Sequence, residues 1–326
     1  MLSNNGVGMT QPVRYSIVIP VYGNAGSIPA LLERLEGISG VLNDEVEAVF
    51  VVDGSPDDSF EILAQLLPRY SVPSQLIQHS RNFGSFAAIR TGMAHARGDF
   101  IAVMAADLQE PPELVIDFFR VLANDEADVA VGRREGRNDP AISSWSSATF
   151  WRLYRRWVFP SMPAGGVDIF ACSRPVMEEI LALDESHSSL VGLLYWVGFR
   201  RAEIPYERQE REHGKSGWSI SKKIRYLLDS VFSFTDLPLT LLIAVGAFGG
   251  FLTLVIGLVV LIAYFAGAIA EPGYTPLMFV MLFSTFSILV ALGIVGTYVW
   301  RTFENTKRRP HAVTSSHWRS DVDANV

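Results

Sequence analysis

Two long runs without a charged residue lie in the C-terminal third of the chain and constrain its fold more than any other feature. Residues 237–270 contain no Asp, Glu, Lys or Arg, and residues 272–300 form a second run of this kind. About 20 mostly apolar residues are enough to cross a bilayer as a helix. Each run therefore predicts a membrane-spanning helix. Buried helices of a soluble core are the disfavoured alternative, because such helices rarely lack charges over this length.

The charges around these runs predict how the chain crosses the membrane. The outer flanks of the two runs are basic, whereas the link between them carries Glu271 and no Lys or Arg. Lys and Arg are enriched on the cytoplasmic side, so both flanks are expected in the cytoplasm and the link on the opposite side. The first twelve residues lack the basic and apolar regions of a signal peptide, so the part before residue 237 is expected in the cytoplasm too. The basic flanking residues are Lys222, Lys223, Arg225, Arg301, Lys307, Arg308 and Arg309.

These features divide the chain into segments. An amphipathic helix is expected just before the first span, because apolar residues from Ile220 to Phe232 share one helical face and basic residues flank it. The expected segments are a disordered N-terminus (1–12), a cytosolic catalytic domain (13–217), this juxtamembrane helix (218–236), two transmembrane helices (237–270 and 272–300) and a cytosolic tail (301–326) that is polar and disordered from Pro310 onward.

Strand-like and helix-like patterns alternate over residues 15–134. The strand-like runs are apolar and rich in β-branched residues, as in strands that are buried on both faces of a sheet. Such alternation predicts an α/β fold with a mostly parallel, doubly wound, Rossmann-like sheet. The expected strands are Ser16–Val21, Val46–Val52, Gln75–Gln78, Phe100–Ala105 and Asp128–Val131, and the expected helices are Ser27–Leu35, Asp58–Leu67, Ser85–Ala96 and Glu113–Leu122.

Four of these strands are followed by segments that contain turn residues and charges. Ligands of doubly wound sheets bind beyond the carboxyl ends of the strands. Carboxylates at that edge suit a hard divalent cation and arginines suit phosphates, although each loop taken alone could be an ordinary solvated turn. Together the loops predict a site for a nucleotide diphosphate and a metal ion. The segments are PVYGNAGS (20–27), DGSPDD (53–58), ADLQEPPE (106–113) and GRREGR (132–137).

The composition excludes other classes of function. The net charge is -7, so no overall basic field favours nucleic-acid binding. The single cysteine, Cys172, excludes a disulfide framework and a cysteine-based zinc site, and it is expected to be a small buried apolar residue. An enzyme that faces a reducing cytosol fits this composition best.

Five motifs occur in the order that is typical of one family. They resemble the inverting glycosyltransferases of family 2, which have the GT-A fold, and in particular the branch that makes polyprenyl-phosphate sugars. Dolichyl-phosphate mannose synthases and bacterial undecaprenyl-phosphate glucosyltransferases belong to this branch, and the resemblance covers about residues 15–225. The motifs are YSIVIPVYGNAGSIPALL (15–32), VVDGSPDDS (51–59), SRNFGSFAAIRTGMAHARGD (80–99), ADLQEPPE (106–113) and HGKSGW (213–218).

The resemblance implies a donor site that uses Mg²⁺ or Mn²⁺. Asp107 and Gln109 are the expected metal ligands, because they are two residues apart in a segment expected to be extended and so project to one side. The chain departs from the family pattern at two places, since Val52 and Ala105 each stand where the family has an additional aspartate. The residues implied to bind the nucleotide sugar are Pro20, Tyr22, Asn24, Asp53, Arg90 and Asp107.

The resemblance implies an acceptor site as well. Asp168, in AGGVDIFACSRP (164–175), resembles a family aspartate that faces donor and acceptor, and with Asp107 it is the expected catalytic residue, as a base or an orienting carboxylate. Gly217 stands where the family has Lys or Arg. The residues implied to bind the acceptor phosphate are Arg133, Arg134, Arg137, Arg208, Arg211, Lys215 and Ser216.

The function implied by the resemblance is transfer of a hexose from a nucleotide sugar, with UDP-glucose as the leading donor, to a polyprenyl phosphate such as undecaprenyl phosphate. The enzyme would be a multi-pass protein of the bacterial inner membrane with its catalytic domain on the cytoplasmic side, and a homo-oligomer, with a tetramer suggested by the family. Two alternatives stay open: a family 2 transferase that acts on a glycan, and a catalytically inactive membrane scaffold with the same fold. The sequence does not identify the sugar.

Overall fold

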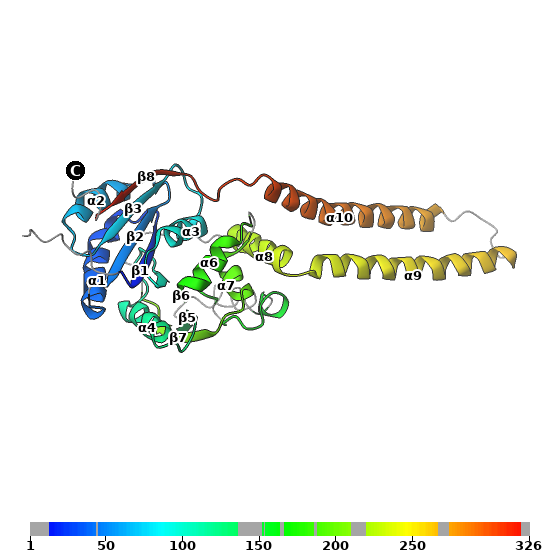
Figure 1. Cartoon of the computed structure of the whole chain (residues 1–326). Coiled ribbons are helices and arrows are strands. Elements are labelled where there is room, and N and C mark those ends of the chain that lie inside the picture. The colour runs from blue at the N-terminus through cyan, green and yellow to red at the C-terminus, as the bar shows by residue number, and fades with distance from the viewer. Residues whose placement is uncertain are drawn as a thin grey trace, which may run out of the picture. The chain divides into compact units, whose positions relative to one another are not determined.

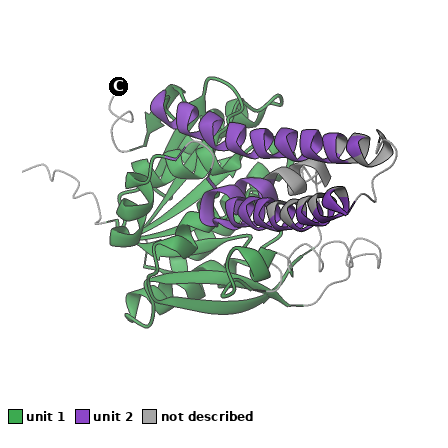
Figure 2. Ribbon diagram, turned by 90° about the vertical axis from the view of Figure 1, so that its right-hand side faces the viewer, with its two compact units in different colours: residues 1–184, 189–223, 309–326 green, residues 185–188, 224–308 purple. Residues whose placement is uncertain are grey.

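The computed structural model describes residues 13–43, 45–135, 152, 154–163, 166–185, 188–209, 220–266 and 274–320. The chain divides into two compact units, which Figure 2 shows in different colours. The first unit contains residues 1–184, 189–223 and 309–326, and the second contains residues 185–188 and 224–308. The first unit holds the sheet and the second holds the long helices.

The first unit is built on one mixed sheet of eight strands in the order β7-β5-β6-β4-β1-β2-β3-β8 (Figure 1). Neighbouring strands from β4 to β3 run parallel, as do β5 and β7, whereas β6 and β8 are antiparallel to their neighbours. The sheet is therefore mostly parallel, as the sequence predicts. The strands are β1 (Tyr15–Val21), β2 (Val46–Val52), β3 (Ser74–His79), β4 (Phe100–Val103), β5 (Val129–Glu135), β6 (Phe170–Ser173), β7 (Arg201–Glu207) and β8 (Thr314–Arg319).

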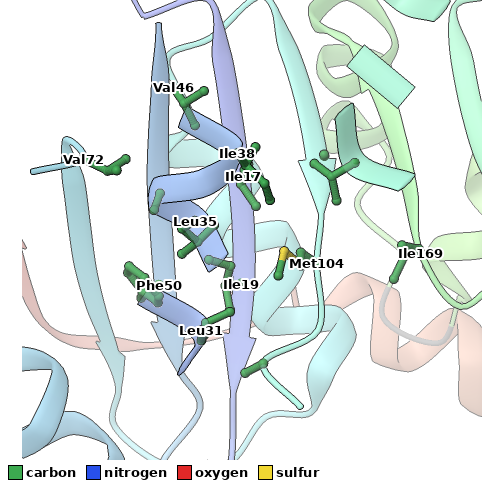
Figure 3. Close-up of a cluster of buried hydrophobic side chains, with 14 of the residues drawn as sticks. Ile17, Ile19, Leu31, Leu35, Ile38, Val46, Phe50, Val72, Met104 and Ile169 are labelled. Carbon is green, nitrogen blue, oxygen red and sulfur yellow. The ribbon is translucent and has the colours of Figure 1, made fainter. Parts of the chain in front are cut away.

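Helices cover both faces of this sheet, so the central strands are apolar on both sides. Alternate residues of β1 show this directly: Ile17 and Ile19 pack with helix residues Leu31 and Leu35 (Figure 3), while Val18 on the other face meets Gly92. The helices of the first unit are α1 (Ile28–Val41), α2 (Ser59–Leu66), α3 (Ser85–His95), α4 (Pro112–Ala123), α6 (Arg174–Ala182) and α7 (Leu190–Trp196).

The C-terminal tail contradicts the sequence-based expectation. Residues 310–326 were expected to be disordered, but residues 314–319 form β8, which pairs with β3 at the edge of the sheet. The Trp318 side chain packs against the hydrophobic core, so this polar segment contributes apolar contact as well as backbone pairing. The tail therefore belongs to the sheet, because an edge strand needs only one buried face and can be polar on the other.

Among the described residues, the second unit contains most of α8 (Ile220–Phe234) and all of α9 (Leu237–Phe265) and α10 (Tyr274–Thr306). The amphipathic segment expected before the first span is helical, as α8. Within the unit, Arg301 of α10 donates hydrogen bonds to Asp229 (2.7 Å) and Ser233 (2.9 Å) of α8. This ion pair joins α8 to the C-terminal end of α10.

One helical segment among the described residues, Phe283–Thr306, is long and apolar enough to cross a membrane by itself, and none of its most apolar stretch is buried. Tyr226–Phe234 and Leu237–Gly249 meet the same criterion only as a pair bent by 78°. Large apolar side chains of α9 and α10 are exposed, including Ile243 at 70% and Phe286 at 66%. The structure thus supports one membrane span, and the second span stays a prediction.

Candidate active site

The loops that follow β1 and β2 are joined by hydrogen bonds centred on Asp57. Its carboxylate accepts bonds from the Ala25 amide (2.9 Å), the Ser55 hydroxyl (2.5 Å) and the Ser59 hydroxyl (2.6 Å). Partial burial raises the pKa of this carboxyl, but the hydrogen bonds from Ser55, Ser59 and Ala25 outweigh burial, so the pKa is lowered overall. Asp57 therefore holds the loop that carries Tyr22, although sequence reasoning gave it only a turn position.

The expected nucleotide-binding residues of the first loop lie at the carboxyl edge of the sheet. Pro20 is in β1, and Tyr22, just after the strand, is 52% exposed, so its ring is accessible to a planar base. The side-chain oxygen of Asn24 accepts a hydrogen bond from the Tyr22 amide at 3.1 Å, which fixes the loop locally. The Gly23 amide donates to Ser55 at 2.8 Å. The loop is thus held in place from both sides.

Asp53 lies in the interior rather than on the surface where a nucleoside would meet it. The residue is 3% exposed, and its carboxylate accepts hydrogen bonds from His79 Nδ1 (2.8 Å) and from the amides of Phe83 (2.8 Å) and Gly84 (2.7 Å). Because α3 begins at Ser85, the carboxylate acts at the N-terminus of that helix, where a negative charge is favourable. Asp53 therefore positions the 80–84 loop, and its expected contact with the nucleoside stays a prediction.

Gly54 lets the loops after β2 and β3 approach each other closely. Its φ is 57°, and a Cβ placed there would lie 2.4 Å from the carbonyl carbon of Arg81. We expect Gly54→Ala to force the 80–84 loop away and to lower the free energy of unfolding by about 2–3 kcal/mol. The matched control is Gly23→Ala, since Gly23 also has a positive φ (70°) but open space around the new methyl group.

Thermal unfolding of the purified variants measures this difference. The Gly23→Ala control should lower the free energy of unfolding by only about 1–2 kcal/mol, which is the cost of placing alanine in the left-handed conformation. Equal losses in the two variants would contradict the close approach of Gly54 to Arg81.

The segment after β4 forms a tight turn that carries Asp107, Gln109 and Glu110. Leu108 adopts a left-handed conformation with φ 61°, and the Gln109 amide donates to the Asp107 carboxylate at 3.3 Å. The segment is therefore not extended, which corrects the geometry assumed from the sequence. Asp107 and Gln109 nevertheless lie close together at the carboxyl edge, because the Gln109 amide is bonded to the Asp107 carboxylate within the turn.

The end of β7 joins this turn. The Gln109 side-chain oxygen accepts a hydrogen bond from Arg208 Nη2 at 2.6 Å, and the Gln209 amide donates to the Gln109 carbonyl at 2.9 Å. The amide group of Gln109 also donates to the Gln209 carbonyl at 3.2 Å. Residues that are about 100 positions apart in sequence are thereby locked side by side.

Asp168 lies beside the same arginine. The Tyr206 hydroxyl donates to Asp168 Oδ2 at 3.1 Å, and Arg208 Nη1 is 3.9 Å from that oxygen. Burial first, and then the charge of Asp168, raises the pKa of the Tyr206 hydroxyl, so it remains a hydrogen-bond donor at neutral pH. The Asp168 side chain is 40% exposed, so it is accessible to a ligand while one of its oxygens is fixed.

Glu110 is a site residue that the sequence reasoning missed. It is 3% exposed, and its Oε2 atom has no hydrogen-bond partner within the described part of the chain. Burial first, and then the charge of Asp107, raises the pKa of this carboxyl to about 7, while Arg208 opposes the shift and Asp168 adds to it. The motif shows the residue type, but the burial and the surrounding charges arise only in the folded chain.

This pKa predicts a pH-dependent stability. Between its ordinary pKa of 4.5 and its raised pKa of about 7, Glu110 binds more protons in the folded than in the unfolded state, so stability falls as the pH rises through that range. Glu110→Gln should abolish this pH dependence. Between pH 4.5 and pH 8, the free energy of unfolding of the variant should therefore rise by about 2–3 kcal/mol relative to that of the wild type. Thermal unfolding in the presence of a chelator measures it, and parallel pH profiles would contradict the assignment.

The arginines expected at the acceptor site separate into two groups. Arg133 pairs with Glu135 (2.9 Å) and Glu203 (3.8 Å), two exposed carboxylates. Arg134 pairs in register with Tyr206, and alternation along β5 places it on the face where Gly132 contacts that tyrosine. Arg133 is thus engaged by surface carboxylates and Arg134 lies beside Tyr206, and the acceptor role of both arginines stays a prediction. Arg137, Arg211, Lys215 and Ser216 lie outside the described residues.

Arg90 lies at the end of a helix. Its guanidinium donates to the carbonyls of Ile180 (3.0 Å), Leu181 (3.1 Å) and Leu183 (3.0 Å), where α6 ends. A cation at a helix C-terminus satisfies carbonyls that the helix leaves without partners. This contact gives Arg90 a structural role, and the expected contact with the nucleotide stays a prediction. Cys172 is fully buried, as the sequence predicts.

The residues of the Asp107 turn fit a divalent cation that is shared with a substrate phosphate. Asp107, Glu110 and Asp168 lie within electrostatic reach of one another, and Arg208 is the cation that opposes their charge. Within the described ranges, no three His, Cys, Asp or Glu side chains are grouped so that they could hold a metal ion by themselves. Mg²⁺ is commonly held by one or two carboxylates together with substrate phosphates, which matches a single turn in which Asp107 and Gln109 are half-buried.

The doubly wound sheet and the carboxylate- and arginine-rich site at its edge define an enzyme that acts on anionic substrates. The profile of Glycosyl transferase family 2 matches residues 16–181, which is half of the chain. The chain therefore belongs to glycosyl transferase family 2 and is a glycosyltransferase.

Relatives match almost the whole chain. The uncharacterized glycosyltransferase YkcC of Bacillus subtilis (strain 168) is 31% identical, over 93% of this chain and 93% of its own length. The undecaprenyl-phosphate 4-deoxy-4-formamido-L-arabinose transferase of Pseudomonas savastanoi pv. phaseolicola (strain 1448A / Race 6) is 32% identical, over 92% of this chain and 89% of its own. Among solved structures, the mannosyltransferase PcManGT from Pyrobaculum calidifontis, in complex with GDP-Man and Mn²⁺, aligns with a TM-score of 0.46 at 14% identity, over 90% of this chain and 88% of that one.

Proposed function

We propose that this glycosyltransferase moves a sugar from a nucleotide sugar to a polyprenyl phosphate at a membrane surface. The observation that carries the proposal is the cluster in which Arg208 lies between the Asp107 turn and Asp168. It puts an anion-binding guanidinium next to a carboxylate that suits a metal-bound diphosphate. The chain then continues from β7 into helices that carry exposed apolar side chains. A phosphate attached to a membrane lipid fits both features.

In this proposal, each side of the cluster serves one substrate. The Tyr22 ring stacks on the base of the donor, and the 80–84 loop, fixed by Asp53, borders the donor side. Asp107 and Gln109 would hold Mg²⁺ or Mn²⁺, which supplies charge neutralisation on the departing diphosphate. Arg208 and Arg134 bind the acceptor phosphate, because guanidinium groups bind phosphate oxygens in a fixed geometry.

The reaction needs little help from a base. A phosphate monoester is largely a dianion at neutral pH, so its oxygen can attack the anomeric carbon without losing a proton first. The oxygen–carbon bond forms as the bond from that carbon to the diphosphate breaks, and the nucleoside diphosphate leaves. Asp168, held by Tyr206, then acts mainly as an orienting carboxylate for Arg208 and the sugar.

The identity of the substrates is a finer proposal. The relative from Pseudomonas savastanoi is named for undecaprenyl phosphate, which supports that acceptor, and we take UDP-glucose as the leading donor. We place the enzyme in a bacterial inner membrane, with two spans and with the catalytic domain and both chain ends on the cytoplasmic side. We also propose a homo-oligomer, with a tetramer as the leading form.

An assay with the purified full chain tests this proposal. Undecaprenyl phosphate, Mn²⁺ and a panel of radiolabelled nucleotide sugars are supplied in detergent, and label that extracts into organic solvent and is released by mild acid is counted. We expect one donor to give such a product. Label that enters only an added glycan would favour the glycan-acting transferase, and nucleotide binding without any transfer would favour the inactive scaffold.

A further inference from the structure

The turn that carries Asp107 contains a residue in an unfavourable backbone conformation. Leu108 has a φ of 61°, in the left-handed region that bulky residues rarely adopt, and it is buried. Such a conformation persists only where the surrounding structure holds it in place, and it is found most often at functional sites. The backbone that presents Asp107 and Gln109 therefore depends on contacts from outside the turn.

The start of α1 and a residue within this helix make those contacts. The Ser27 hydroxyl, at the N-cap, donates a hydrogen bond to the Ala106 carbonyl at 2.7 Å. Arg34 Nη1 donates to the carbonyls of Leu108 (3.2 Å) and Glu110 (2.8 Å). Three alternate carbonyls of the turn thus accept hydrogen bonds from one helix. The two bonds from Arg34 come from a charged group, and such bonds are stronger than those between neutral groups.

The side of α1 that faces the turn is anchored in the core. Ser27 is 3% exposed, and Arg34 follows it by seven residues, about two helical turns, so both side chains lie on the same side of the helix. Between them, Leu31 belongs to the same buried hydrophobic cluster as Met104 (Figure 3) and Leu108. The polar contacts with the turn therefore start from a helix that is itself fixed by packing.

We propose that Arg34 and Ser27 are positioning residues that hold the Asp107 turn in the conformation that binds the divalent cation. They act on the backbone of the turn and supply no ligand themselves. Groups that orient the ligands of a metal raise its affinity by about 10–100-fold. The inference rests on one part of the proposed function, the binding of the cation by Asp107 and Gln109. The simpler alternative is that both residues only stabilise the fold.

A matched pair of arginine variants separates these roles. Arg34→Met removes the two hydrogen bonds to the turn and keeps a long side chain. The control is Arg174→Met, because Arg174 also donates to two backbone carbonyls, those of Ala96 (3.2 Å) and Gly98, but it does so before β4, at the amino edge of the sheet. Both variants should lower the unfolding temperature by similar amounts. A difference between them at the Asp107 turn then reports the position of the arginine rather than the loss of stability.

Hydrogen–deuterium exchange of the full chain in detergent, without metal or substrate, measures the turn directly. We expect Arg34→Met to speed exchange in peptides that cover residues 104–110 by about tenfold or more, because the turn opens more easily without the bonds from a charged donor. Ser27→Ala should speed exchange in the same peptides by a smaller factor, and Arg174→Met should leave it unchanged. Unchanged exchange in Arg34→Met, or an equal increase in both arginine variants, would overturn the proposal.

Electron paramagnetic resonance measures Mn²⁺ binding by the same proteins, alone and with UDP or GDP added. Arg34→Met is expected to weaken binding by about tenfold. Arg34→Lys should recover part of the affinity, since its ammonium group can still donate to a carbonyl, and Arg174→Met should match the wild type. Equal Mn²⁺ affinity in Arg34→Met and the wild type, or a wild type that binds no Mn²⁺, would overturn the proposal.

Neither measurement uses a sugar donor or a lipid, so the outcome does not depend on the reaction. Faster exchange and weaker Mn²⁺ binding in Arg34→Met, in an enzyme that transfers no sugar to a polyprenyl phosphate, would support the positioning role and refute only the proposed function. Sugar transfer to the lipid with no change in exchange or in Mn²⁺ binding would refute only the positioning role.

Discussion

Replacing Asp107 with asparagine is expected to lower kcat/KM for sugar transfer by about 100-fold or more. The change removes the negative charge from the turn after β4 and leaves its size nearly unchanged. The neutral amide oxygen of asparagine is a weaker ligand for a divalent cation than the carboxylate of Asp107. The measurement is the initial rate over a series of Mn²⁺ and donor concentrations.

Asp117→Asn is the matched control, since the Asp117 side chain in α4 is 44% exposed and forms an ion pair with Arg120 one turn away. It should keep the wild-type rate, because surface pairs of this kind contribute little. Asp57→Asn is not a suitable control, since Asp57 holds the loop of Tyr22. Similar small effects at Asp107 and Asp117 would show that Asp107 does not hold the cation.

Glu47→Ala is expected to cause the largest loss of stability, about 3–5 kcal/mol. Glu47 is 0% exposed, and its carboxylate accepts hydrogen bonds from Ser16 (2.7 Å), Gln75 (3.1 Å) and the side chain of Arg97 (2.7 Å). The variant leaves these donors without their acceptor in the interior, and unpaired buried groups are costly. Chemical denaturation of the purified protein measures the loss.

Glu47 lies at the opposite edge of the sheet from Asp107, so its replacement tests stability rather than catalysis. It is the second residue of β2, near the amino edge of the sheet, whereas Asp107 follows a strand at the carboxyl edge. Glu179→Ala, at an exposed position in α6, serves as the control and should change the free energy of unfolding by less than about 0.5 kcal/mol. A loss at Glu47 no larger than this would contradict a fully paired buried carboxylate.

The central sheet could be predicted from the sequence because its signals are local. Runs such as Val46–Val52 are buried at every position and apolar at all but Glu47, as expected of a strand that is covered on both faces. β8 gives no such signal, since Thr314–Arg319 is mostly polar and its exposed side looks like a loop. What makes it a strand is the open edge of β3, more than 230 residues earlier in the chain. Such a long-range partner cannot be read from a local pattern.

The site was predicted in part for a related reason. Asp107, Gln109, Asp168 and Arg208 were expected from motifs, and the structure brings them together. The roles that were missed or changed depend on contacts between loops. Glu110 is buried beside the charges of Asp107 and the distant Arg208, and the Asp53 carboxylate accepts hydrogen bonds from amides thirty residues away. A motif specifies which residue is present, but the surrounding loops decide what its side chain faces.

The most direct test of the central claim is to identify and quantify the nucleotide that the enzyme releases in the presence and in the absence of the lipid. The full chain is incubated with the nucleotide sugar that the panel identifies, with and without undecaprenyl phosphate, and the released nucleotide and the lipid product are identified by mass spectrometry. Sugar transfer to the lipid phosphate predicts lipid-dependent release of nucleoside diphosphate, in equal amount to a lipid that carries one phosphate and one sugar. Release of nucleoside monophosphate, or of diphosphate at the same rate without the lipid, would contradict it.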